Sequence, residues 1–77
     1  MTVFDLKKGE AAKIERINIE GGARARLFAL GVKEGEEVEV LSYSLFRSSI
    51  LLAVGAVRVG IRKSLASKIF VKTEGEV

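Results

Sequence analysis

Residues 24–40 read RARLFALGVKEGEEVEV, and within this stretch the hydrophobic period changes from that of a helix to that of a strand. Apolar residues first recur at i, i+4 and i+7, as on one helix face, and Gly31 follows as a typical helix end. From Glu36 to Tyr43 apolar and polar residues alternate, as in a half-buried strand. Together with Ala23, which precedes it, the stretch therefore predicts a short helix leading into a strand, with core-facing residues Ala23, Leu27, Leu30, Val38 and Val40.

The residues before this stretch predict a capped turn and a bulged strand. Thr2 and Asp5 have the spacing of a capping box, so a single helical turn is expected there. An alternating strand then reaches Ile14 on even positions and continues from Ile17 on odd ones. A strand with a period of two changes parity only through an extra residue, so we expect a β-bulge near Glu15–Arg16.

The residues after Tyr43 predict three more strands. Ile50–Val54 is dense in β-branched and aliphatic residues, Gly55-Ala56 forms a tight turn, and Val57–Ile61 alternates. Ser64 is expected to cap a single helical turn before a closing strand. That closing strand is Ile69–Val71, and the core residues assigned to this part of the chain are Val57, Val59, Ile61 and Val71.

Five short strands, one short helix between the first two strands, and two single turns predict a mainly β fold. In 77 residues this means a small, strongly bent antiparallel barrel, because an open sheet would leave long edges exposed. No repeat or linker interrupts the pattern, so residues 1–77 are predicted to form a single domain. Within it, Glu74–Val77 is expected to fray.

The composition argues against catalysis. The chain has no cysteine and no histidine, which excludes thiolate chemistry, Cys-based zinc sites and the commonest general base. Its net charge of +3, from 13 Lys and Arg against 10 Asp and Glu, describes a mixed surface. We therefore predict a protein that is not an enzyme, with no catalytic residues and no cofactor.

Two further features concern the cellular location. The first ten residues lack an apolar targeting segment. Arg47 is the only charge in residues 41–57, but this segment is too short for a helix that spans a membrane and also contains four serines and a glycine. We expect a cytoplasmic protein with no direct membrane insertion.

Four glutamates crowd the turn and the strand that begin at Glu34, which raises the question of a site for a hard cation. Glu37 and Glu39 are expected on the solvent face of the strand, and no calcium-loop spacing is present. A solvated strand face is therefore the favoured interpretation. Without imidazole or thiolate ligands, no tight site for a transition metal is predicted.

Two groups of side chains are candidates for binding a partner. Basic residues on the helix and on one strand suggest an RNA platform, but few aromatic residues accompany them and no RNA-binding motif is present, so nucleic acid is an unlikely partner. Apolar residues at the end of the second strand and in the following loop either fold back over the barrel end or form a docking patch. In that second group, Leu41 and Tyr43 are expected to face outward, and Leu45 and Phe46 to lie in the loop.

The ordered pattern as a whole resembles the FeoA family, small cytosolic accessory proteins of bacterial and archaeal ferrous iron transport. The most specific part is the segment from Arg26 to Gly35, which reads Arg-Leu-x-x-Leu-Gly-x-x-x-Gly. The resemblance extends from Leu6 to Val71. The chain departs from the family where Ser44–Ser49 replaces a loop that often contains proline, and where glycine replaces the usual alanine at position 60.

The resemblance implies an SH3-like barrel that assists FeoB, a large permease with a cytosolic GTPase domain, by docking or regulation. The predicted partner-binding residues are Arg24, Arg26, Leu41, Tyr43, Leu45 and Phe46, and self-association is left open. The alternative is a small basic RNA- or ribosome-associated barrel that uses Arg24, Arg26, Arg58 and Arg62.

Overall fold

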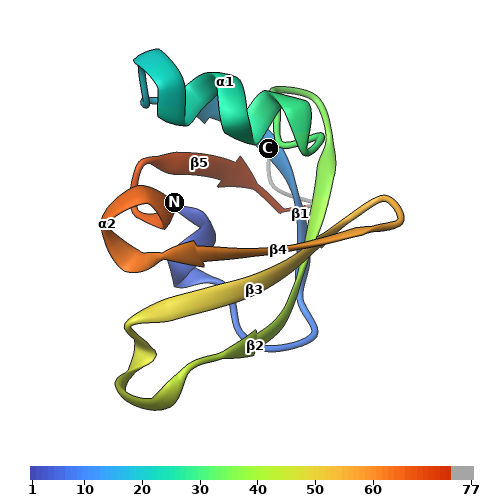
Figure 1. The fold of residues 1–77 in the computed structure, drawn as a ribbon. Helices are drawn as coiled ribbons and strands as arrows, with labels where there is room; N and C mark the ends of the chain where they lie inside the picture. Colours follow the sequence, from blue (N-terminus) through green and yellow to red (C-terminus); the bar gives the residue numbers. More distant parts are fainter. Residues whose placement is uncertain (74–77) are drawn as a thin grey trace.

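The computed structural model describes residues 1–73 as a mainly β protein with a single five-stranded antiparallel sheet (Figure 1). The strand order is β4-β3-β2-β1-β5. The elements are η1 (Val3–Asp5), β1 (Ala11–Ile17), α1 (Gly21–Ala29), β2 (Glu37–Tyr43), η2 (Leu45–Arg47), β3 (Ser49–Val54), β4 (Val57–Arg62), α2 (Lys63–Ala66) and β5 (Ile69–Lys72). The predicted fold class is confirmed, while Glu74–Val77 lies outside the described residues.

The sheet is strongly bent, as expected, but strand pairing does not close it into a ring. Among the described residues, β4 pairs only with β3, while β5 pairs with β1 and, through an isolated bridge at Phe70, with Thr2. Helix α1 lies beyond β5 in Figure 1, on the side away from the β2–β3 hairpin. The result is an SH3-like fold in which β4 and β5 are the edge strands of the sheet.

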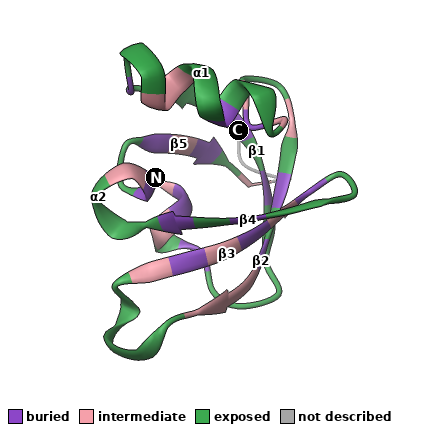
Figure 2. Cartoon of the chain, viewed as in Figure 1, coloured by how far each residue is buried: buried purple, intermediate pink, exposed green. Residues whose placement is uncertain are grey.

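The core fills the inside of the bent sheet, and each strand contributes alternate residues to it (Figure 2). All of its side chains are apolar, because no polar or charged residue among those described is buried. The largest completely buried side chains are Leu6, Ile14, Ile50, Leu52 and Ile69. Burial of this apolar area is the main source of stability in so small a protein.

Most of the predicted core is confirmed, with two corrections to the core and one to the predicted helix cap. Leu30 is 38% exposed because it forms the C-cap of α1, and Val32, 1% exposed, enters the core instead. Val57 is 40% exposed at the turn that begins β4. Ser64 lies inside α2, whose N-cap is Arg62. The predicted residues that are buried are Leu27, Val38, Val40, Val59, Ile61 and Val71, and Ala23 packs against them half-buried.

Two local predictions near the N-terminus are confirmed. The β1–β5 register shifts between Ile14 and Arg16, so the expected β-bulge is present. The capping box is formed as well, since the backbone N–H of Thr2 donates to Oδ2 of Asp5 at 2.8 Å. This N-terminal segment is joined to β5, where the N–H of Val71 donates to the carbonyl oxygen of Met1 at 2.9 Å.

Candidate protein-interaction site

A second β-bulge, in β2, determines which way the end of this strand faces. The β2–β3 register shifts between Val40 and Ser42, which leaves Leu41 as an extra residue on β2. One extra residue reverses the alternation of side chains between the two faces of a sheet. Tyr43 therefore pairs with Ile50, whose side chain is buried, and it turns toward the core.

Tyr43 covers the barrel end rather than projecting from it. Its hydroxyl donates to the carbonyl oxygens of Phe4, at 3.2 Å, and Leu6. Its ring meets the ring of Phe4 edge to face, with centroids 5.1 Å apart and planes at 79°. Burial raises the pKa of Tyr43, while the positive charge of Arg47 opposes that rise. The prediction that Tyr43 faces outward is wrong because the bulge at Leu41 was not foreseen.

Arg47 completes this aromatic cluster from outside. Its guanidinium carbon lies 4.1 Å from the ring centroid of Tyr43 and 5.2 Å from that of Phe4. Nη2 of Arg47 also donates to the carbonyl oxygen of Phe4 at 2.9 Å. The guanidinium therefore ties the β2–β3 hairpin to the N-terminal turn through a cation–π contact and a hydrogen bond.

The loop between β2 and β3 is closed by serine hydrogen bonds. Oγ of Ser44 accepts the N–H of Ser49 at 2.8 Å and lies 3.0 Å from Oγ of Ser48. The N–H of Arg47 donates to the carbonyl oxygen of Ser44 at 2.8 Å. Phe46 (φ 63°) adopts the left-handed conformation, which costs a non-glycine residue about 1 kcal/mol or more. These bonds stabilise the loop and offset part of that cost.

The same loop presents two apolar side chains to solvent. Leu45 is 79% exposed and Phe46 is 91% exposed, the largest exposures of any large apolar residue described. We call these two residues the hairpin tip. Their predicted position in a loop is confirmed, and their side chains do not fold back over the barrel end.

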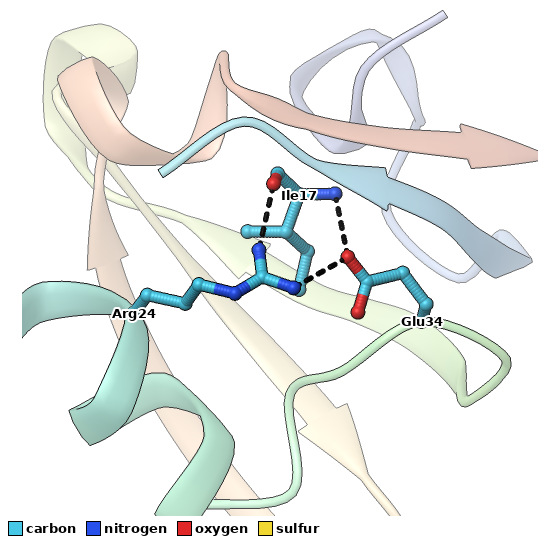
Figure 3. A network of polar contacts seen from close by, with 3 residues as sticks. All are labelled: Ile17, Arg24 and Glu34. Atoms are coloured by element: carbon cyan, nitrogen blue, oxygen red, sulfur yellow. Dashed lines mark hydrogen bonds and ion pairs between the residues drawn. The ribbon is translucent and has the colours of Figure 1, made fainter. Parts of the chain in front are cut away.

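Arg24, which was also predicted to bind a partner, makes its closest contacts within the molecule (Figure 3). Its Nη1 donates to the carbonyl oxygen of Ile17 at 2.8 Å, and its Nη2 pairs with Oε2 of Glu34 at 2.8 Å. The same carboxylate oxygen accepts the N–H of Ile17 at 3.3 Å. The hydrogen bond from Arg24 is the main reason that the pKa of Glu34 lies below its usual value. This network joins α1 to the end of β1.

The six predicted binding residues are not brought together. Arg24 and Arg26 lie on α1, whereas the hairpin tip lies on the far side of the sheet in Figure 1. Arg26 lines a groove beside β4, and Leu41 is half-buried in β2. Arg47 was missed by the sequence analysis, although it is the single charge in the apolar stretch of residues 41–57. The signal available in the sequence was a single positive charge close to aromatic residues, which favours a cation–π contact.

Two of the glutamates after the helix project into solvent. Glu37 and Glu39 are exposed on the outer face of β2, which confirms the interpretation of a solvated strand face. Within residues 1–73 no three acidic side chains converge in a way that could hold a metal ion. No helix in that range combines the length and apolar character that crossing a membrane requires.

A bent five-stranded sheet around a wholly apolar core places this protein among the small SH3-like β proteins. The chain belongs to the FeoA family, since residues 1–73 match the sequence profile of the FeoA domain. The resemblance seen in the sequence is thereby confirmed. No curated protein matches the chain.

Solved structures of FeoA proteins share the fold. Iron(II) transport protein A from Clostridium thermocellum is 28% identical with a TM-score of 0.90, covering 97% of this chain and 46% of that one. FeoA from Chlorobium tepidum is 26% identical with a TM-score of 0.90, covering 96% and 70%. Stenotrophomonas maltophilia FeoA, complexed with zinc and described as an SH3 domain protein, is 26% identical with a TM-score of 0.75, covering 94% and 89%. This chain thus spans less than half of the C. thermocellum chain.

Proposed function

We propose that this chain is a non-enzymatic, cytoplasmic accessory protein of ferrous iron uptake that docks on the cytosolic part of a FeoB-type permease. Membership of the FeoA family supports the link to ferrous iron. The S. maltophilia relative has been put forward as a ferrous iron transport activating factor, which supports a regulatory role. Arg24, Arg26 and Leu41 remain candidates for the docking surface, but the hairpin tip is the strongest one.

The observation that carries this proposal is the exposure of Leu45 and Phe46 on a loop that is closed by its own hydrogen bonds. Large apolar side chains at the centre of an interface supply much of the binding energy in protein complexes. Arg47 and the serine bonds fix the loop before any partner arrives. Binding therefore loses less conformational entropy than it would with a mobile loop.

The test is calorimetric titration of this chain with the cytosolic part of the FeoB-type permease from the same organism. Replacing both residues of the tip, Leu45→Ser with Phe46→Ser, should weaken binding about 30-fold or more, the scale of an aromatic hot spot. The melting temperature should change little, because neither side chain contacts the core. Phe28→Ser is the matched control, since Phe28 is 61% exposed on α1. Equal binding by the double variant and wild type would contradict the proposal.

The RNA alternative predicts a different outcome. Phosphate contacts through Arg58 and Arg62 would give RNA binding whose logarithm falls steeply with the logarithm of salt concentration. We expect no such binding, because the groove that Arg62 lines next to β4 contains no aromatic residue on which a base could stack. A steep salt slope with a structured RNA would favour the alternative over docking on the permease.

A further inference from the structure

A groove separates α1 from the segment formed by β4 and α2. It has a volume of about 460 Å³, and its lining runs along β4 as far as Ser64 and Leu65 of α2. Leu27 and Leu30 form one wall, and Val59, Ile61 and Leu65 contribute apolar surface from the other side. Leu30, which is 38% exposed, is the most exposed of these apolar residues. Leu30 and the half-buried Leu65 therefore supply the accessible apolar surface of the groove, whereas Leu27, Val59 and Ile61 are buried beneath it.

One side of the groove is the edge of a β-strand. Within residues 1–73, β4 pairs with β3 and with no other strand, so the backbone groups along its second edge lack strand partners. Such an edge is a template for an added strand. Gly60 lies on β4 in this groove, and a Cβ atom at that position would meet no heavy atom within 4 Å. The missing side chain leaves room for another backbone.

The groove also carries positive charge. Arg26 on α1 and Arg62 at the end of β4 both line it, and no acidic residue does. Neither arginine takes part in an ion pair among residues 1–73, where the single pair is Arg24 with Glu34. Two guanidinium groups without carboxylate partners, next to an apolar wall, favour a ligand that is partly apolar and carries a carboxylate.

We propose that this groove binds an extended, acidic and apolar segment of a FeoB-type permease as an added strand on β4. This inference rests on the proposed function and adds a second contact to the one made by the hairpin tip. The free strand edge selects an extended backbone, the apolar wall selects alternate apolar side chains, and the arginines select a carboxylate. A nucleic acid fits less well, because the lining has no aromatic ring on which a base could stack.

The experiment titrates the isotope-labelled chain with the cytosolic part of the permease and follows amide hydrogen exchange and affinity. Exchange of β4 amides should slow when the added strand pairs with them. Arg26→Ala combined with Arg62→Ala should weaken binding about tenfold or more, through loss of charge-assisted hydrogen bonds. Gly60→Leu should weaken binding by filling the groove without lowering the melting temperature, and the Arg pair provides the test if Gly60→Leu fails to fold.

Arg58→Ala is the matched control, because Arg58 is exposed on the same strand but does not line the groove. It should bind within about twofold of wild type, as expected for an exposed charge. Unchanged affinity in the groove variants, with binding lost in the tip variant, would overturn this inference and leave the proposed function standing. Unchanged exchange of β4 amides in the complex would also overturn it, as would sedimentation showing that a second copy of the chain occupies β4. A wild-type chain that does not bind the permease overturns both proposals.

Discussion

Replacing Tyr43 with phenylalanine tests whether the aromatic cluster holds the N-terminal turn onto β2. The change removes the hydroxyl and leaves the ring to pack on Phe4 and under Arg47. The hydroxyl donates to the carbonyl oxygens of Phe4 and Leu6, and Leu6 is only 1% exposed, so water cannot readily replace the lost donor there. A buried acceptor without a donor costs about 1–3 kcal/mol, and because one of the two carbonyls keeps its bond from Arg47 we expect about 1.5 kcal/mol.

In a domain of this size, each kcal/mol shifts the melting temperature by about 4–8 °C, so Tyr43→Phe should melt roughly 6–12 °C below wild type. Thermal unfolding followed by circular dichroism measures the shift, and urea unfolding measures the free energy. Tyr43→Ala should cost about 3 kcal/mol or more, because the contacts with Phe4 and Arg47 are lost as well. If Tyr43→Phe melts within about 1 °C of wild type, the hydroxyl does not stabilise the N-terminal turn and the account given for this cluster is wrong.

The same variant changes the stability at alkaline pH. Burial raises the pKa of Tyr43 above its ordinary value of 10.0, so the folded protein favours the neutral phenol more than the unfolded chain does. Its contribution is fully present below pH 10 and is lost as the pH rises through the folded pKa. The free energy of unfolding of wild type should therefore fall more steeply above pH 10 than that of Tyr43→Phe, which cannot ionise at this position.

Three other measurements test the remaining structural conclusions. Leu27→Ala should lower the free energy of unfolding by about 2–3 kcal/mol, the lower part of the usual range, because this buried side chain also borders the open groove. If chemical denaturation shows no loss of stability, α1 does not pack on the core through Leu27. Glu34→Gln should make the loss of stability in acid less steep, because the pKa of Glu34 is lowered from 4.5 and its stabilising effect, present above pH 4.5, is lost as the pH falls through the folded pKa. Urea unfolding of wild type and variant between neutral pH and about pH 3 compares how the free energy of unfolding depends on pH. Calorimetry with Fe²⁺ or Zn²⁺ should show no stoichiometric micromolar site in the isolated chain, since it has no histidine or cysteine, and a one-to-one binding isotherm would refute this.

The two β-bulges show how far a sequence pattern can predict the direction of side chains. In both strands the inward residues are three positions apart at the bulge, Ile14 to Ile17 in β1 and Val40 to Tyr43 in β2. In β1 the intervening residues are charged, so the change of parity was visible and the bulge was predicted. In β2 the extra residue is Leu41, and an apolar residue there hides the change. The strands themselves were predictable because their alternation depends on local spacing alone.

The contacts of the hairpin loop could not be predicted in the same way. Arg47 reaches the carbonyl oxygen of Phe4 across 43 positions of the sequence, and no local period indicates that pairing. The pairing of Arg24 with Glu34 depends on the return of the chain after the helix, which brings the end of β1 and the following turn together. Exposure of the hairpin tip was predictable in part, since a short loop between two strands has few ways to bury its own side chains.

The pairing of β1 with β5 has a consequence for how fast the protein folds. Strands β2, β3 and β4 follow one another along the chain and pair in that order, so their contacts close short loops. The pairing of Ile17 with Ile69, and the bond between Val71 and Met1, instead join segments separated by most of the sequence. Closing so long a loop costs entropy before any contact repays it, so we expect the three-stranded meander to form in the transition state and the β1–β5 seam afterwards. A substitution in that seam, such as Ile17→Val, should then speed unfolding and leave the folding rate nearly unchanged in stopped-flow experiments.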